Sequence, residues 1–263
     1  MNKVRLLLNG NILRLGLSVK TLYYIAMILM IVAYSVTIFP EETIHQLTTE
    51  DGLFENIGAV LFLFTSLVFF YGFWREPGEQ LFLLKKVNRR YAYLLLGILF
   101  FFVFAEEISW GQRIFNTESG AFFLEKNIQK ETNLHNLKIF NSVDEFNIKR
   151  PWWDIFSMSR LFRLFWFILC IGIPIAAQYS KPLHGFFHKL GIPIFRRSTG
   201  LLLAFNYLLL KFFESTLSYQ AEIVEIEECL TGLIFFITAV DQALLSSKIN
   251  QKQSEYYVEH PIS

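Results

Sequence analysis

Two adjacent acidic residues, Glu106 and Glu107, follow an apolar run from Tyr91 to Ala105 that contains no charged residue. A charged side chain at membrane depth costs a few kcal/mol unless it is paired, protonated or facing a wet cavity. On one helix the two side chains point about 100° apart, so they cannot both face lipid cheaply. We therefore predict that Glu106 and Glu107 are catalytic, each as a metal ligand or general base. Solvation at the membrane surface is the alternative.

A second acidic group opens the preceding apolar segment. Asp51 and Glu55 are four residues apart and would share one helix face, on which Gly58 follows. A glycine at this position lets another backbone approach closely. We predict Glu55 as a metal ligand and Asp51 as a supporting residue, although the positive end of a helix would explain Asp51 without any function.

A third acidic group opens the last apolar segment, where Glu222, Glu225 and Glu228 recur every three residues and Gly232 follows. Glu225, Glu228 and Gly232 would share one helix face. The spacing of acid, glycine and phenylalanine repeats that of the second group, which hints at an internal repeat. We predict Glu225 and Glu228 as metal ligands, and a solvated acidic helix start is the alternative.

The segment between residues 119 and 140 carries the histidine that is best placed for chemistry. Leu124, Ile128, Glu131 and His135 recur at helical spacing and would share the apolar side of an amphipathic helix. A carboxylate and an imidazole four residues apart can bind one metal or position one another for acid–base chemistry. We predict His135 as a metal ligand, with a hydrogen-bonded packing role as the alternative. Residues near these groups that we predict to support the site are Trp110, Gln112, Glu131 and Asn136.

Carboxylates gathered at one depth would repel one another strongly at low dielectric constant. Protons, basic partners or a divalent cation must compensate for this repulsion. Oxygen ligands with one imidazole and no thiolate suit Zn, Mn, Fe or Mg, and a metal-bound water beside a spare glutamate is a hydrolytic arrangement. Cys170 and Cys229 lie inside apolar runs, so we interpret them as packed hydrophobic residues.

The elements that position these residues follow from the distribution of charge. The chain has 263 residues, of which 53% are hydrophobic, and its 24 basic and 23 acidic residues leave a net charge of +1. Uncharged windows occur at residues 21–40, 56–74, 91–105 and 164–180. Such segregation is typical of a polytopic membrane protein. An aromatic content of 17% excludes a disordered chain, and the low net charge disfavours a nucleic-acid partner.

We predict an all-α fold, a polytopic membrane helix bundle of about six transmembrane helices in one membrane domain, residues 21–245. The expected spans are residues 21–39, 53–74, 91–111, 162–180, 199–218 and 224–245. The outer segment 112–161 would contain an amphipathic extracytoplasmic helix between the third and fourth spans. Residues 1–20 would form a basic interfacial segment, and residues 246–263 a cytoplasmic tail.

Basic residues indicate the orientation of these spans. They collect in the N-terminal segment, in loops 75–90 and 181–198 and in the tail, whereas segments 40–52 and 215–228 contain none. Short loops rich in Lys and Arg remain in the cytoplasm. We therefore predict that both termini are cytoplasmic, that the membrane is the inner membrane of a bacterium, and that most acidic residues lie near the outer face.

Three sequence blocks carry a resemblance to known proteins. They are EDGxxE at residues 50–55, EEISWGQR at 106–113 and NxQxExNLHN at 127–136. The chain resembles a family of uncharacterised bacterial polytopic membrane proteins that share these blocks, over roughly residues 50–240. The resemblance implies that the blocks form one site, and it carries no activity.

Two other classes of membrane enzyme fit the chain less well. Intramembrane glutamate proteases of the CAAX-processing type use Glu-Glu-x3-Arg and two histidine-bearing helices, whereas this chain has Glu106-Glu107-x5-Arg113 and one well-placed histidine. Membrane desaturases need many clustered histidines, and the five histidines of this chain are scattered.

These observations lead to one main functional hypothesis and two alternatives. The main hypothesis is a divalent-metal-dependent, hydrolytic membrane enzyme that acts on a lipid or lipid-linked substrate at the outer leaflet. The alternatives are a proton- or cation-coupled small transporter and a structural or partner-binding membrane protein without catalysis. A transporter needs a polar path inward, and the spans offer little beyond Thr65, Ser66 and Asn206, which favours a one-sided site.

Overall fold

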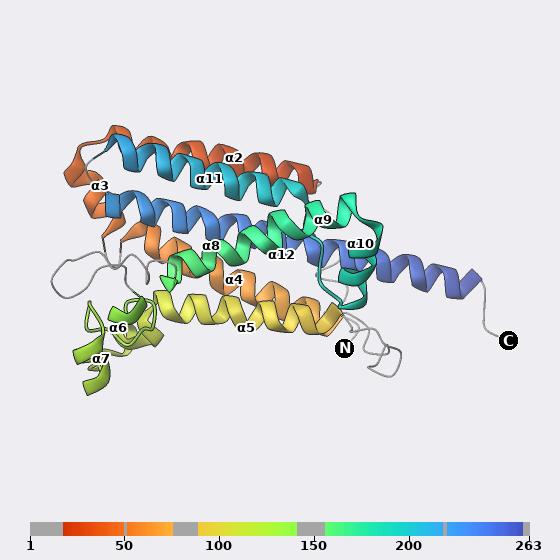
Figure 1. Cartoon of the computed structure of the whole chain (residues 1–263), viewed down its shortest axis with the longest axis horizontal. Helices are drawn as coiled ribbons and strands as arrows, with labels where there is room; N and C mark the ends of the chain where they lie inside the picture. Colours follow the sequence, from red (N-terminus) through yellow and green to blue (C-terminus); the bar gives the residue numbers. More distant parts are fainter. Residues whose placement is uncertain (1–17, 50–51, 76–88, 141–155, 218–219, 260–263) are drawn as a thin grey trace.

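The computed structural model describes residues 18–49, 52–75, 89–140, 156–217 and 220–259. Over these ranges the chain forms a bundle of helices that lie roughly along one long axis (Figure 1). The described residues contain no strand and only one isolated bridge, between Asn127 and Leu137. The predicted all-α fold is therefore confirmed.

The bundle is built from six long helical stretches. Five are the helices α2 (Val19–Ser35), α4 (Leu53–Arg75), α5 (Arg89–Glu107), α11 (Arg197–Thr216) and α12 (Gln220–Glu259). The sixth is made of α8 (Met158–Phe167), a π-helical turn (Ile168–Gly172) and α9 (Ile173–Tyr179). The shorter helices are α3 (Glu41–Thr48), α6 (Gln112–Phe115), α7 (Ala121–Lys126) and α10 (Lys181–Lys189).

Among the described residues, three segments are long and apolar enough to cross a membrane. They are Val19–Ile38, Glu41–Arg75 and Met158–Tyr179, with mean hydropathies of 2.0, 2.0 and 1.8. The outside of the bundle is also apolar, since Ile31 and Leu201 are 60% and 71% exposed. A soluble protein rarely exposes such an apolar surface, so the bundle has the character of a membrane protein.

Helices α4 and α12 pack closely against each other. A Cβ atom added to Gly58 would lie 3.3 Å from Cys229 Cα, and one added to Gly232 would lie 3.3 Å from the carbonyl oxygen of Gly58. The two glycines thus let the backbones touch, as the position of Gly58 predicted. Both helices begin at the same end of the bundle (Figure 1), which brings their first turns together. This end, with Glu55, Glu106, Glu107, Glu225 and Glu228, is called the acidic end below.

Buried polar side chains join α2, α11 and α12 near the acidic end. Tyr34 Oη donates to Asn206 Oδ1 (3.1 Å), and Asn206 Nδ2 donates to Thr231 Oγ1 (3.2 Å). Thr231 Oγ1 in turn donates to Glu227 Oε1 (3.0 Å). Interhelical hydrogen bonds of this kind hold membrane helices together because the hydrocarbon offers no other partner.

A second polar group lies further along the same helices. Tyr23 Oη is 2.9 Å from Thr199 Oγ1, which is 3.0 Å from Thr238 Oγ1. Two apolar residues, Leu203 and Ile234, lie between this group and the first in the sequences of α11 and α12, and each is only 1% exposed. The interior is therefore more polar than the sequence suggested. The two polar groups do not form a continuous path, because Leu203 and Ile234 lie between them.

The predicted amphipathic helix between the third and fourth spans is wrong for most of its length. Helix α7 ends at Lys126, and residues 127–137 form a loop. The reason is the side chain of Asn127, whose Oδ1 accepts hydrogen bonds from the backbone N–H groups of Gln129 (2.9 Å) and Glu131 (3.3 Å). Such local side-chain contacts compete with helical hydrogen bonds.

Several predicted span boundaries also differ from the structure. Helix α5 ends at Glu107 rather than at residue 111, and α8 begins at Met158 rather than at residue 162. Helix α12 continues to Glu259, so its 40 residues extend about 60 Å, well beyond the hydrocarbon thickness. Predictions about residues 1–17, 76–88, 141–155 and 260–263 and about Asp51 lie outside the described residues.

Candidate functional site

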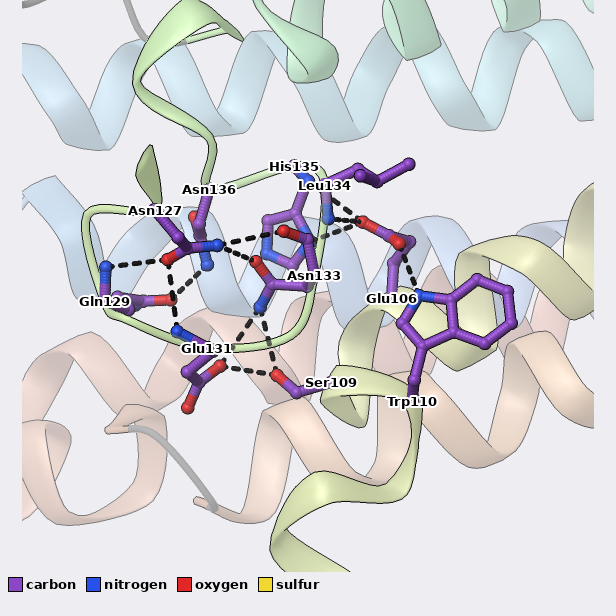
Figure 2. Close-up of polar contacts among 10 residues, drawn as sticks. All are labelled: Glu106, Ser109, Trp110, Asn127, Gln129, Glu131, Asn133, Leu134, His135 and Asn136. Carbon is purple, nitrogen blue, oxygen red and sulfur yellow. Dashed lines mark hydrogen bonds and ion pairs between the residues drawn. The ribbon is translucent and has the colours of Figure 1, made fainter. Parts of the chain in front are cut away.

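Glu106 connects the end of α5 to the loop of residues 127–137. This residue is 5% exposed, and both of its carboxylate oxygens accept hydrogen bonds (Figure 2). Oε1 accepts from Trp110 Nε1 (2.7 Å), and Oε2 accepts from the backbone N–H groups of Leu134 (2.6 Å) and His135 (2.9 Å). These contacts fix the loop on the bundle, and the catalytic role predicted for Glu106 stays a prediction.

The turn that follows α5 has an unusual backbone. Ser109, Trp110 and Gly111 have φ angles of 46°, 54° and 79°, so three successive residues are in the left-handed region. Non-glycine residues adopt this region at a cost, and such strain persists only where neighbouring contacts stabilise it. Here the turn ends α5 and lets the Trp110 indole fold back onto Glu106, as Figure 2 shows.

The loop is also held from within and from Ser109. Ser109 Oγ donates to Glu131 Oε2 (2.5 Å), and Asn133 Nδ2 donates to the same oxygen (3.0 Å). Asn127 Nδ2 donates to Asn133 Oδ1 (2.8 Å), which joins the start of the loop to its middle. Glu131 therefore bonds to the turn after α5. The predicted helix would have placed Glu131 and His135 on one face, but the loop does not.

The other residues predicted to support the site lie in or beside this loop. Gln112 Oε1 accepts hydrogen bonds from Ser119 Oγ (3.0 Å) and from the backbone N–H of Thr132 (2.7 Å). Asn136 Nδ2 donates to Gln129 Oε1. These contacts fix the path of the loop on both sides of His135.

His135 is the residue that the loop presents to the bundle. Its Nδ1 lies 3.5 Å from Glu106 Oε2, and its imidazole is 34% exposed. Glu228 interacts electrostatically with this imidazole across the cavity described below. The fixed loop thus places one imidazole beside one buried carboxylate and opposite another.

The acids predicted from three separate apolar segments do meet at the acidic end. Glu107 interacts electrostatically with Glu55, Glu106, Glu225 and Glu228. The close contact of α4 with α12 and α5 produces this gathering, because each helix carries its acids at the same end. Among the described residues, no three His, Cys, Asp or Glu side chains are arranged as ligands of one metal ion.

A cavity of about 290 Å³ opens beside these acids. Most of its wall is apolar and comes from α4, α5 and α8, with Phe102, Phe162 and Trp166 among its aromatic residues. Its polar lining consists of Glu106, Glu107, His135, Ser159, Arg163, Glu227, Glu228 and Thr231. An apolar wall with a few converging polar groups is the usual composition of a small-molecule site.

Two charged residues of this cavity were not predicted as site residues. Glu227 is 5% exposed and connects the cavity to the Asn206 network through Thr231. Arg163 lies on α8 and interacts electrostatically with Glu227 and Glu228. The sequence did contain signals for both residues. Glu227 directly precedes the predicted ligand Glu228, and Arg163 stands at the start of an otherwise uncharged span.

The acidic end therefore combines a carboxylate cluster, one positioned imidazole and one arginine around an apolar cavity. Comparisons of the chain with protein-family models, with curated proteins and with solved structures found no match.

Proposed function

We propose that this chain is an integral membrane enzyme that hydrolyses a lipid or lipid-linked substrate in the cavity at the acidic end. The composition of the cavity wall is the observation that carries the proposal. Apolar side chains line most of the wall, several of them aromatic, and Glu107, Glu228 and His135 lie among its polar groups. A hydrocarbon chain fits the apolar part, and the bond to be cleaved would lie beside the carboxylates and the imidazole.

The Glu106–His135 pair supplies the base in this proposal. A proton on Nδ1 of His135 faces Glu106 Oε2, which leaves Nε2 as the nitrogen that accepts a proton from water. That proton then passes to the leaving group, so the imidazole returns to its starting state. Arg163 would stabilise negative charge that develops on the substrate.

A divalent cation, Zn, Mn, Fe or Mg, is part of the proposal. Glu55, Glu107, Glu225 and Glu228 would hold it, and when bound it would polarise the substrate oxygen. His135, predicted as a further ligand, serves as the base here, because its Nε2 cannot bind the cation and accept a proton at once. The electrostatic interaction of Glu107 with the neighbouring carboxylates supports this part, because a cation would relieve their repulsion. Since the described side chains are not grouped as ligands, binding would reorder them.

The proposal also covers the membrane topology. Helices α5, α11 and α12 contain 19, 20 and 40 residues and complete six spans with the three apolar stretches. Helix α10 and the start of α11 lie at the end opposite the acidic one, with the start of α2 and the end of α12 (Figure 1). Because Lys181, Lys189, Arg196 and Arg197 lie at that end, we place it in the cytoplasm of a bacterium and the acidic end at the outer leaflet.

Measurements of metal content and of lipid hydrolysis on the purified full-length protein test both parts of the proposal. We expect it to contain about one divalent metal ion per chain and to release a hydrolysis product from one class of a bacterial lipid extract. Glu107→Gln and His135→Ala should each lower the rate by about 100-fold or more, the usual contribution of acid–base catalysis. Metal analysis and mass spectrometry of the lipids measure both effects.

Glu222→Gln is the matched control for this experiment. Glu222 lies on the first turn of α12 but pairs with His45 outside the cavity, at 3.1 Å. This variant should retain both metal and activity. Hydrolysis that survives Glu107→Gln and His135→Ala would contradict the proposed site, and activity without bound metal would remove the cation from the proposal.

A proton-coupled transporter is the second candidate, and the Asn206 network favours it. Hydrogen bonds from Glu227 through Thr231 and Asn206 to Tyr34 connect the cavity to α2 by polar groups. Leu203 and Ile234 interrupt any continuation toward Thr238 in the described structure. Proton flux into vesicles that contain the protein, abolished by Glu227→Gln, would favour transport over hydrolysis.

A further inference from the structure

A second cavity, of about 530 Å³, lies at the end of the bundle opposite the acidic end. Helices α9, α10 and the start of α11 surround it, and it shares no lining residue with the first cavity. Its polar lining residues are Gln178, His184, Arg196, Arg197 and Ser198. Among the residues that the structure describes, no carboxylate lines it, so the charge of its wall is positive.

Arg196 is fixed in this wall by an ion pair with α12. Its Nε donates to Asp241 Oδ2 at 2.5 Å, and Asp241 is 1% exposed, whereas the Arg196 side chain is 44% exposed. The hydrogen bond to Asp241 raises the pKa of the Arg196 guanidinium above its usual value. Asp241 offsets one of the two arginine charges, so Arg197 leaves the cavity cationic.

Helix α10 places the cavity at the level of lipid headgroups. It carries Lys181 and Lys189 at its ends, and its apolar residues Leu183 and Phe186 are 42% and 52% exposed. A short helix with basic residues and exposed apolar residues lies in the membrane interface, with its apolar side among the acyl chains. A ligand in the adjacent cavity would therefore have hydrocarbon next to it.

We propose that this cavity binds the phosphate headgroup of an anionic phospholipid, with Arg196 and Arg197 as its cationic ligands. Guanidinium groups form strong, charge-assisted hydrogen bonds with phosphate. His184 and Ser198 add polar groups around the headgroup, and the apolar side of α10 accommodates the acyl chains. The site is independent of the proposed hydrolysis at the acidic end.

Native mass spectrometry of the full chain in detergent tests this proposal, with phosphatidylglycerol and phosphatidylcholine as probes. We expect phosphatidylglycerol to bind at least about fivefold more tightly, since one basic contact is worth about that factor. Arg197→Gln should remove most of this preference. Lys189→Gln, which removes a basic residue of α10 that does not line the cavity, should change it less than about twofold.

Three results would overturn the proposal. The first is equal binding of the two lipids by the unsubstituted protein. The second is an equal loss of preference in Arg197→Gln and Lys189→Gln, which would indicate surface charge rather than a site. The third is displacement of phosphatidylglycerol by millimolar inorganic phosphate, which would indicate a free-phosphate site without a role for the acyl chains.

Discussion

Replacing Glu106 with alanine should release the loop of residues 127–137 from α5. The substitution removes the acceptor of two backbone N–H groups, those of Leu134 and His135, and of the Trp110 indole. Hydrogen bonds to a charged partner contribute about 1.5–3 kcal/mol each, and 1.4 kcal/mol is a factor of ten. Hydrogen exchange at Leu134 and His135 should therefore accelerate by about 100-fold or more, measured by mass spectrometry of the purified protein.

Two further variants make this experiment specific. Glu125→Gln removes a carboxylate of α7 that is exposed and pairs with Lys126, so exchange in the loop should not change. Glu106→Gln keeps one acceptor oxygen but places an NH₂ group against N–H donors, so its effect should be intermediate. Unchanged protection of Leu134 and His135 in Glu106→Ala would show that Glu106 does not hold the loop.

Replacing Gly200 with alanine should destabilise the protein strongly, because the added methyl group meets a backbone atom. Its Cβ would lie 2.4 Å from the carbonyl oxygen of Cys170 and 2.8 Å from Ile171 Cγ1. Cys170 belongs to the π-helical turn between α8 and α9. To accommodate the added methyl group, α11 must move away from this turn. Overpacking costs about 1–3 kcal/mol, which for this chain length lowers the Tm by up to roughly 10 °C.

The same substitution should also affect the cavity at the acidic end. Helix α8 supplies Arg163 and much of the aromatic wall, and the contact at Gly200 holds the stretch that continues from α8 against α11. Gly185→Ala is the matched control, because nothing lies within 4 Å of the added Cβ in α10. It should leave the Tm unchanged or slightly higher, since alanine favours a helix. Equal Tm values for the two variants would contradict the tight contact at Gly200.

The apolar runs and their glycines determined much of the bundle without tertiary information. Uncharged stretches predict membrane helices because hydrocarbon penalises every charge, and Gly58 predicts a close helix contact because it has no side chain. Acids at the start of α4 and α12 and at the end of α5 predict a cluster. Helices α4 and α12 run parallel and α5 runs antiparallel to them, so all three bring their acids to the same end of the bundle. The electrostatic contacts of Glu107 with Glu55, Glu225 and Glu228 agree with that reasoning.

The roles of individual site residues depended on contacts distant in sequence. Glu106 and Glu107 are adjacent and chemically identical, yet Glu106 binds a loop almost 30 residues away, whereas Glu107 interacts with the acids of α4 and α12. The loop itself exists because Asn127 bonds to the backbone ahead of it rather than continuing α7. Periodicity assumes a regular helix and therefore placed Glu131 beside His135.

The sequence by itself thus determined the helical membrane character of this protein and the end of the bundle at which its acids gather, since both follow from the cost of burying charge along each segment. Only the tertiary structure decided which carboxylate positions the loop and which ones face the cavity. Arg163 and Glu227 joined the wall only through the packing of α8 and α12. Such assignments depend on hydrogen bonds and packing between segments distant in the chain, which no local pattern contains.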